Sequence, residues 1–302
     1  MVSTSINKYI YITVNPKFDD KIRASYSRTE MVDHVDRLQH ELIREALKMV
    51  RIEKGIEITS ISDIPSRGTG LGSSSTYTVG LLNALYAYRN YFAGAERLAH
   101  EACIIEIERC GKPIGKQDQY IAAYGGFKFI RFNPDGSVFV DPIVCAPETR
   151  ERLQDGLLML YTGLVRNADD ILREQSDNTH TDEEKRASLR RMVGLAEQMR
   201  EALQGNDLGG FGEVLHAGWM EKRKLASGIT KPCIDEWYER ARAHGAIGGK
   251  ILGAGGGGFL LLYAPPERHP GICEALPELH PIDFQFSYQG SKLIYVEENG
   301  YG

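Results

Sequence analysis

Residues 65–75, PSRGTGLGSSS, form the segment of the sequence best suited to bind an anion. Its three glycines have no Cβ, so the backbone can fold tightly around a ligand. Three serines follow, and a helix is expected to begin there, with unpaired N–H groups and the positive end of its dipole. Such a loop suits a polyphosphate, and a serine hydroxyl can complete the coordination of Mg²⁺. The candidate phosphate-binding residues are Pro65, Gly68, Gly70, Leu71, Gly72, Ser73, Ser74 and Ser75.

The other interpretation of this segment is a glycine-rich connection with a serine N-cap. Three features favour the anion site: a preceding strand and proline, the spacing of the glycines, and the helix start. The segment is not a Walker A loop, because G-x-x-x-x-G-K-[ST] is absent.

A second glycine-rich loop at residues 253–258, GAGGGG, formally satisfies G-x-G-x-x-G. A dinucleotide-binding fingerprint should follow a strand and open a helix. Here the strand-like run FLLLY follows instead, so the oxidoreductase interpretation is disfavoured. A plain flexible turn is the remaining alternative.

A mixed α+β set of strands and helices positions these loops. Residues 6–14, 55–61, 127–132 and 137–142 have strand composition, the last two as a hairpin around Asn-Pro-Asp-Gly. Apolar residues at helical spacing predict helices over residues 76–91 and 93–110, and one long amphipathic helix over residues 28–50.

The second half of the chain also has an α+β order of elements. Strands are predicted over residues 156–162 and 259–263, with a final hairpin formed by residues 284–288 and 292–296. Helices are predicted over residues 168–175, 181–204, 211–225 and 231–244. The boundary between the halves falls near residues 150–156, which gives domains at residues 1–153 and 154–302.

The composition of the 302-residue chain is that of an ordinary globular protein, with 42% hydrophobic and 25% charged residues. The net charge of −5 gives no reason to expect nucleic acid or an acidic membrane as a partner. Five cysteines without a C-x-x-C pair indicate reduced thiols. Neither a signal peptide nor a run of 18 apolar residues occurs, so the cytoplasm is the expected location.

Three segments together resemble the GHMP kinases, the family of galactokinase, homoserine kinase, mevalonate kinase and phosphomevalonate kinase. PSRGTGLGSSS resembles the second motif, GKQDQYIAAYGG at 115–126 the catalytic-aspartate segment of the sugar-kinase branch, and KILGAGGGGFLLLY at 250–263 the third motif. The chain is most similar to the D-glycero-D-manno-heptose 7-phosphate kinase branch, with fucokinase-like kinases nearby. The resemblance implies an α+β, two-domain GHMP kinase fold, with a left-handed βαβ-type ATP-binding domain followed by a ferredoxin-like domain.

The resemblance also implies roles for the carboxylates. Asp118, placed in a short polar turn, would orient the attacking hydroxyl as the catalytic aspartate; without the resemblance it is a cap or turn residue. Glu106 would bind Mg²⁺ together with Ser74. Its other interpretation is a solvated helix face, and Glu108 or Glu101 could take its place.

Basic residues near the transferred phosphoryl group would be Lys8, predicted in the middle of the first strand, and Lys116. Lys8 could equally extend its ammonium group to solvent. For the substrate, Arg166 follows a strand and suits a phosphate clamp. Lys222 and Lys224 are the alternative clamp, although most of their helix is expected to be a basic surface. By resemblance, the third motif would close on the substrate with Gly255, Gly256 and Gly257.

One expected part is not found in the sequence. GHMP kinases carry a first motif before the segment VSTSINKYIYITV, and this chain starts almost where that motif ends. A misassigned gene start, a shortened chain and a true loss are all open. Sugar binding and turnover depend on which of these three explanations is correct, whereas ATP binding by the loop does not.

The expected function is therefore that of an ATP- and Mg²⁺-dependent sugar kinase. It would act on a sugar or sugar phosphate, most similar to the kinases that phosphorylate the anomeric hydroxyl of D-glycero-D-manno-heptose 7-phosphate. Fucose or galactose is the alternative substrate, and a nucleotide-binding protein of low activity is the alternative class. A homodimer is left open.

Overall fold

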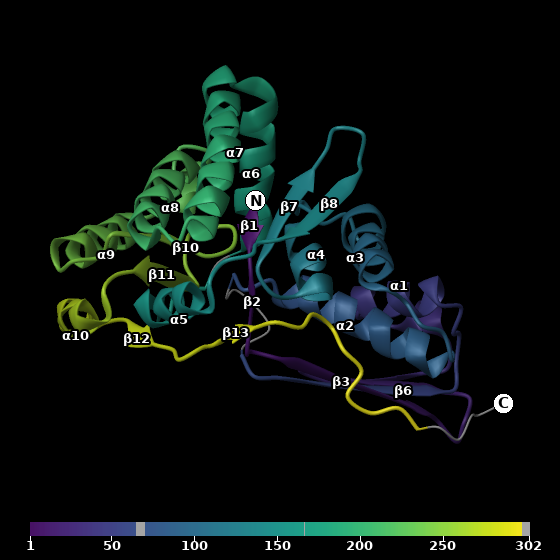
Figure 1. The fold of residues 1–302 in the computed structure, drawn as a ribbon. Coiled ribbons are helices and arrows are strands. Elements are labelled where there is room, and N and C mark those ends of the chain that lie inside the picture. The colour runs from purple at the N-terminus through teal and green to yellow at the C-terminus, as the bar shows by residue number, and fades with distance from the viewer. Residues whose placement is uncertain (65–69, 166, 298–302) are drawn as a thin grey trace. The chain divides into compact units, whose positions relative to one another are not determined.

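The computed structural model describes residues 1–64, 70–165 and 167–297 (Figure 1). The chain forms two compact units that are interleaved in sequence. Unit 1 contains residues 1–6, 70–71 and 127–286, and unit 2 contains residues 7–64, 72–126 and 287–297. The predicted division into residues 1–153 and 154–302 instead separates two continuous halves, and it stays a prediction.

Unit 2 is built on a four-stranded sheet in the order β3-β6-β4-β5. Strands β4 and β6 are parallel and are connected through β5 and α1, whereas the other neighbours are antiparallel. Helix α2 lies against β3 and also contacts α1, α3 and α4. The elements are β3 (Ile10–Pro16), β4 (Ile22–Ser25), β5 (Thr29–Val32), α1 (Glu41–Met49), β6 (Ile56–Ser62), α2 (Ser73–Tyr88), α3 (Ala95–Cys103) and α4 (Gln117–Tyr124), with a 3-10 helix at Val35–Arg37 and a π-helix at Ile104–Arg109.

The core of unit 2 lies between this sheet and its helices. The strands alternate, so that Ile22, Ile56 and Ile58 are fully buried on the covered side. Leu81, Leu82 and Leu85 of α2 are also fully buried. This packing holds α2, whose first turn is the end of the predicted phosphate-binding segment.

Unit 1 contains a four-stranded antiparallel sheet in the order β10-β11-β9-β12. Along the chain, β9 is followed by helices, then the pair β10 and β11, then α10 and β12. This order and strand arrangement are those of a ferredoxin-like split βαβ motif, as predicted. The elements are α5 (Pro147–Gly156), β9 (Leu157–Tyr161), α6 (Ala168–Thr181), α7 (Glu183–Gln204), α8 (Leu208–Lys222), α9 (Pro232–Ala243), β10 (Gly248–Ile251), β11 (Phe259–Tyr263), α10 (His269–Ala275) and β12 (His280–Pro281), with 3-10 helices at Ser227–Ile229 and Pro266–Arg268.

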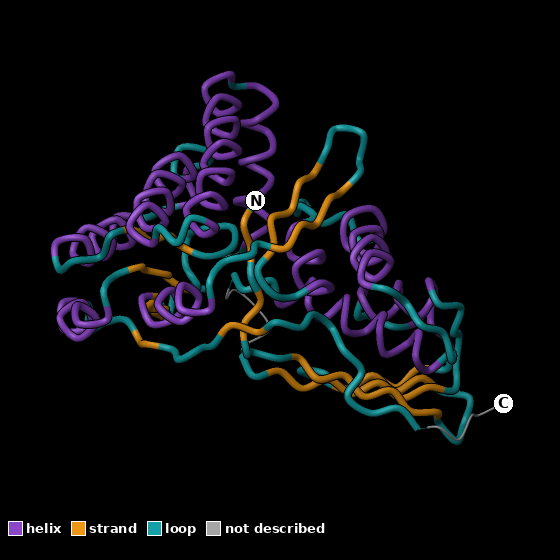
Figure 2. Tube along the Cα trace, viewed as in Figure 1, coloured by secondary structure: helices purple, strands orange, loops and turns teal. Residues whose placement is uncertain are grey.

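The remaining strands are short (Figure 2). In unit 1, β7 and β8 form the predicted antiparallel hairpin, and β1 pairs with β7 on its other side. These strands are β1 (Val2–Ser3), β7 (Lys128–Phe132) and β8 (Val138–Pro142); β2 (Ser5–Ile6) and β13 (Phe286–Ser287) contain two residues each.

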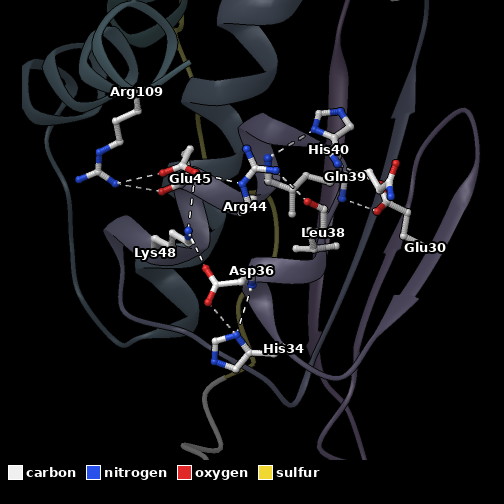
Figure 3. Close-up of polar contacts among 11 residues, drawn as sticks. Glu30, His34, Asp36, Leu38, Gln39, His40, Arg44, Glu45, Lys48 and Arg109 are labelled. Atoms are coloured by element: carbon white, nitrogen blue, oxygen red, sulfur yellow. Dashed lines mark hydrogen bonds and ion pairs between the residues drawn. The ribbon is translucent and has the colours of Figure 1, made fainter. Parts of the chain in front are cut away.

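The predicted long helix over residues 28–50 is wrong. Strand β5, the short 3-10 helix and α1 occupy this stretch (Figure 3). The buried carboxylate of Glu30 accepts the backbone N–H groups of Gln39 at 2.6 Å and His40 at 3.1 Å. Arg44 donates to the carbonyl of Leu38 at 2.9 Å. Because these side chains bind the backbone between β5 and α1, they stabilise a turn in place of a continuous helix.

The predicted final hairpin is also wrong. Residues 288–297 adopt no helix or strand. The start of this segment instead binds α4 and α2: Ser291 N–H donates to the Ala122 carbonyl of α4 at 2.8 Å, and Asn83 of α2 donates to the Ser291 hydroxyl at 3.0 Å. Just beyond α4, Gly126 N–H donates to the carbonyl of Ser287, the last residue of β13, at 3.2 Å. Residues 287–291, named here the C-terminal strap, therefore pack along the end of α4.

The five cysteines are all free thiols, as predicted. Within the described residues, no helix combines the length and the apolar character needed to cross a membrane.

Candidate active site

Helix α2 begins directly after Gly72, three residues before the predicted start. The φ of Gly72 is 68°, in the left-handed region that glycine adopts without strain. As the cap residue it offers no side chain to the first turn of Ser73, Ser74 and Ser75. N–H groups of a first turn have no partner within the helix, and the helix dipole is positive there. This helix start is therefore suited to an anion such as phosphate.

Ser74 and Glu106, which were predicted to act together, are in direct contact. The Ser74 hydroxyl donates to Oε1 of Glu106 at 2.5 Å. Glu106 lies in the π-helix that continues α3, and π-helical turns are frequent at functional sites. Of the alternatives, Glu108 is exposed, and Glu101 accepts hydrogen bonds from a tyrosine of α2 and an arginine of α3. Glu106 is therefore the carboxylate that the fold places beside the serine.

Asp118 lies in the first turn of α4, whereas the sequence predicted a short turn without a helix. Its carboxyl group lies against Gly72. A Cβ added to Gly72 would be 3.0 Å from Cγ of Asp118 and 3.1 Å from its Oδ2. The two segments, 46 positions apart in the sequence, thus meet at the start of α2.

The two carboxylates influence each other. Burial raises the pKa of Glu106, and the negative charge of Asp118 raises this pKa further. Hydrogen bonds from Ser74, Ser75 and Gln119 act in the opposite direction and favour the ionised form. A pair of acidic groups with one member fully buried is an environment that favours a nearby cation.

Two features of this site gave no signal in the sequence analysis. Gln119, next to Asp118, is fully buried and donates to Oε2 of Glu106 at 2.6 Å. At the other end of α4, a Cβ on Gly125 would lie 2.1 Å from the nitrogen of Gly290, so the C-terminal strap approaches the helix backbone closely. The order of residues along the chain does not reveal a contact between segments so far apart.

Lys8 was predicted in the middle of a strand, but the structure places it outside any strand. It is half-buried in the connection that precedes β3. Strand β3 begins at Ile10, which pairs with Ser62 of β6. The pairing with β6 continues to Pro16, which lies opposite Ile56. Its proposed role toward the phosphoryl group stays a prediction. Pro65, Gly68 and Arg166 lie outside the described residues, and their roles also stay predictions.

The second glycine loop connects β10 to β11 and opens no helix, which agrees with the rejection of a dinucleotide fingerprint. Its glycines at 253 and 255–258 all have positive φ values. Gly256 N–H donates to the carbonyl of Ile229 at 2.7 Å, and Gly258 N–H donates to that of Leu164 at 3.0 Å. Two amides of the loop therefore bind within unit 1, and the substrate-binding role of Gly255, Gly256 and Gly257 stays a prediction.

The alternative clamp residues have partners in unit 1. Lys222 donates to the carbonyl of Gly253 and so holds the start of this loop. Lys224 pairs with Glu221 at 2.7 Å. In the part of the chain that the structure describes, no group of three or more His, Cys, Asp or Glu side chains is arranged to hold a metal ion.

Comparisons with known proteins agree with this arrangement. Residues 37–126 match the family model for the GHMP kinases N terminal domain, and residues 199–281 match the model for the GHMP kinases C terminal domain. The first match contains Gly72, Ser74, Glu106 and Asp118. The chain therefore belongs to the GHMP kinase family and is a phosphotransferase.

Individual relatives are similar over three quarters of the chain or more. The D-glycero-alpha-D-manno-heptose 7-phosphate kinase of Campylobacter jejuni is 28% identical over 97% of this chain and 90% of that protein. A solved D-glycero-D-manno-heptose 1-phosphate kinase from Bacteroides thetaiotaomicron is 25% identical, with a TM-score of 0.72 over 96% of this chain and 88% of that chain. The bifunctional fucokinase/GDP-fucose pyrophosphorylase of Arabidopsis thaliana is 29% identical over 76% of this chain, which spans only 22% of that protein.

Proposed function

We propose that this chain is an ATP-dependent sugar kinase that phosphorylates the anomeric hydroxyl of D-glycero-D-manno-heptose 7-phosphate. The observation that carries the proposal is the contact of Asp118 with Gly72 at the start of α2, beside the Ser74–Glu106 pair. Support for the substrate class comes from the heptose 7-phosphate kinase of Campylobacter jejuni and the heptose 1-phosphate kinase of Bacteroides thetaiotaomicron.

The residues at the start of α2 would bind ATP. Phosphoryl transfer asks the protein mainly for positioning, charge neutralisation and a group that handles the proton of the acceptor. The first-turn amides of α2 and the segment Gly70–Ser75 would hold the phosphates. Asp118, directly beside Gly72, would orient the acceptor hydroxyl and take its proton.

The same residues fit Mg²⁺ by their donor chemistry. Ser74 and Glu106 place two oxygen ligands 2.5 Å apart, and Asp118 adds negative charge nearby. Mg²⁺ commonly takes only one or two protein carboxylates and completes its shell with phosphates and water. A site with few protein ligands is therefore what this ion requires. When bound, Mg²⁺ would offset the negative charge of the phosphates.

A panel assay tests the proposal. The purified protein is incubated with Mg-ATP and one acceptor at a time, with ADP release as the readout: heptose 7-phosphate, heptose 1-phosphate, fucose or galactose. We expect turnover with heptose 7-phosphate. Turnover with fucose or galactose alone would support one of the alternative substrates, of which fucose corresponds to the fucokinase named for the Arabidopsis relative. ATP binding without turnover on any acceptor would contradict kinase activity and favour a nucleotide-binding protein. A cytoplasmic location and a homodimer stay predictions.

A further inference from the structure

The fully buried amide of Gln119 is the least expected part of the site. Each oxygen of the Glu106 carboxylate has a donor: Oε1 accepts from Ser74 at 2.5 Å, and Oε2 accepts from Gln119 Nε2 at 2.6 Å. The buried Ser75 hydroxyl also hydrogen-bonds to this carboxylate. Both Glu106 and Gln119 are 0% exposed, whereas Ser74 is exposed. The carboxylate is thus fixed from its buried side by Gln119 and approached on its other oxygen by the serine.

We propose that Gln119 is a positioning residue that orients Glu106 for divalent-cation binding; this proposal rests on the proposed function. A buried carboxylate needs hydrogen-bond donors, since leaving it without them costs free energy. A lysine or arginine would satisfy the carboxylate but would also neutralise the charge that attracts a cation. The neutral amide of Gln119 binds Oε2 of Glu106 without neutralising its charge. Oε1 of Glu106 stays on the side of Ser74.

Helix α4 couples this role to that of Asp118. The two residues are neighbours in the first turn, about 100° apart around a helix of 3.6 residues per turn. One side chain therefore lies against Gly72 while the next binds Glu106. The first turn of α4 therefore determines the positions of both carboxylates of the site, Asp118 directly and Glu106 through Gln119.

The oxygen atom of the Gln119 amide gives a second argument for a bound cation. Oε1 of Gln119 is buried and has no hydrogen-bond partner among the described residues. Buried polar atoms in native proteins are generally paired, with ordered water included. Water molecules coordinated by a cation are strong donors, so a bound ion with its water shell would supply the missing partner.

The test is a double-mutant cycle on the Mg²⁺ requirement. Gln119→Met keeps the length of the side chain and removes the donor, and Glu106→Gln removes the charge. The Mg²⁺ concentration for half-maximal effect is measured in two ways, as the rise in unfolding temperature with a non-hydrolysable ATP analogue and as the ADP-release rate. Gln117→Met is the matched control, because Gln117 is an exposed glutamine on the same helix.

Loss of an outer hydrogen bond to a metal ligand typically costs about 10–100-fold in metal affinity. We expect Gln119→Met to raise the Mg²⁺ requirement by about that factor in both readouts, and Gln117→Met to leave it unchanged. Because Gln119 acts through Glu106, the double variant should be no worse than Glu106→Gln alone. A purely structural role would instead give additive losses.

The outcomes separate the two proposals. If Glu106→Gln raises the requirement but Gln119→Met does not, the role of Gln119 is overturned and the metal site stands. If Glu106→Gln itself leaves the requirement unchanged, both fall. Should Gln119→Met fail to fold, Gln119→Asn provides the second variant: it keeps the amide but is one methylene shorter, so its nitrogen no longer reaches Oε2 of Glu106, and we expect the same raised requirement. An unchanged requirement in a folded Gln119→Asn protein would overturn the role.

Discussion

Replacing Gly72 by alanine is the perturbation whose effect the structure defines most closely. The φ of Gly72 is 68°, and an added Cβ would lie 3.0 Å from Cγ of Asp118. Two costs follow. An L-residue in the left-handed region loses about 1–2 kcal/mol. Separately, carbon atoms prefer to be about 3.5–4.0 Å apart, so the Asp118 carboxyl group must move by roughly 0.5 Å or more.

Gly55→Ala separates these two costs. Gly55 belongs to the same unit and has nearly the same φ, 73°, but an added Cβ would meet no atom within 4 Å. Both variants should therefore lose similar stability from backbone strain. A loss of about 1 kcal/mol in the free energy of unfolding lowers the unfolding temperature of a domain by about 2–4 °C. The unfolding temperature of each variant should therefore fall by a few degrees.

Only the Gly72 variant should lose activity. A misplacement of about 1 Å near the reacting groups can cost about 100-fold in rate, so a shift of half that size should lower kcat by about 10-fold or more. The assay is ADP release at saturating Mg-ATP and acceptor, beside thermal unfolding of both variants. Equal kcat values for Gly72→Ala and Gly55→Ala would refute the placement of Asp118 against the phosphate loop.

Two further predictions concern parts of the fold away from this contact. Hydrogen bonding from Arg191 lowers the pKa of Glu221 from 4.5 to about 2, so its stabilising effect is complete above pH 4.5 and is lost as the pH falls toward 2. Glu221→Gln should cost about 1 kcal/mol at pH 7, and its thermal unfolding curve should approach that of the wild type below pH 4.5; a constant difference from pH 7 to pH 3 would contradict this. In the C-terminal strap, a Cβ on Gly290 would lie 2.1 Å from the carbonyl oxygen of Ala123, so Gly290→Ala should displace the strap or α4 and lower kcat by about 10-fold. Unchanged kcat in that variant, with Gly271→Ala as the open-space control, would show that the strap does not position Asp118.

The sequence predicted those parts of the fold that local patterns determine. The alternation of residues 55–61 and the apolar run FLLLY became β6 and β11. The turn Asn-Pro-Asp-Gly became the hairpin of β7 and β8. In each case the hydrophobic period and the turn chemistry of adjacent residues agree with the tertiary structure.

The failures have a common physical cause. Residues 28–50 have helical spacing, but the buried Glu30 carboxylate binds the backbone at Gln39 and His40, which no periodicity encodes. Residues 284–296 have strand composition, but Ser291 N–H binds the end of α4 in place of a neighbouring strand. Tertiary contacts override local preference at both places.

The candidate site was predictable as a set of motifs and not as a geometry. Resemblance selected Ser74, Glu106 and Asp118, and the structure brings the first two into hydrogen-bond contact. Gln119 follows Asp118 directly, yet its role depends on burial against Glu106, which only the folded arrangement reveals.

The most direct test of the account is Asp118→Ala, measured for turnover and for ATP binding in the same preparation. Positioned acid–base groups typically contribute about 10²–10⁴-fold to the rate. We expect ADP release with heptose 7-phosphate to fall by about that factor, while ATP affinity stays within a few-fold of the wild type, because the first turn of α2 is intact. Turnover within a few-fold of the wild type would contradict the assignment of Asp118 as the residue that acts on the acceptor hydroxyl.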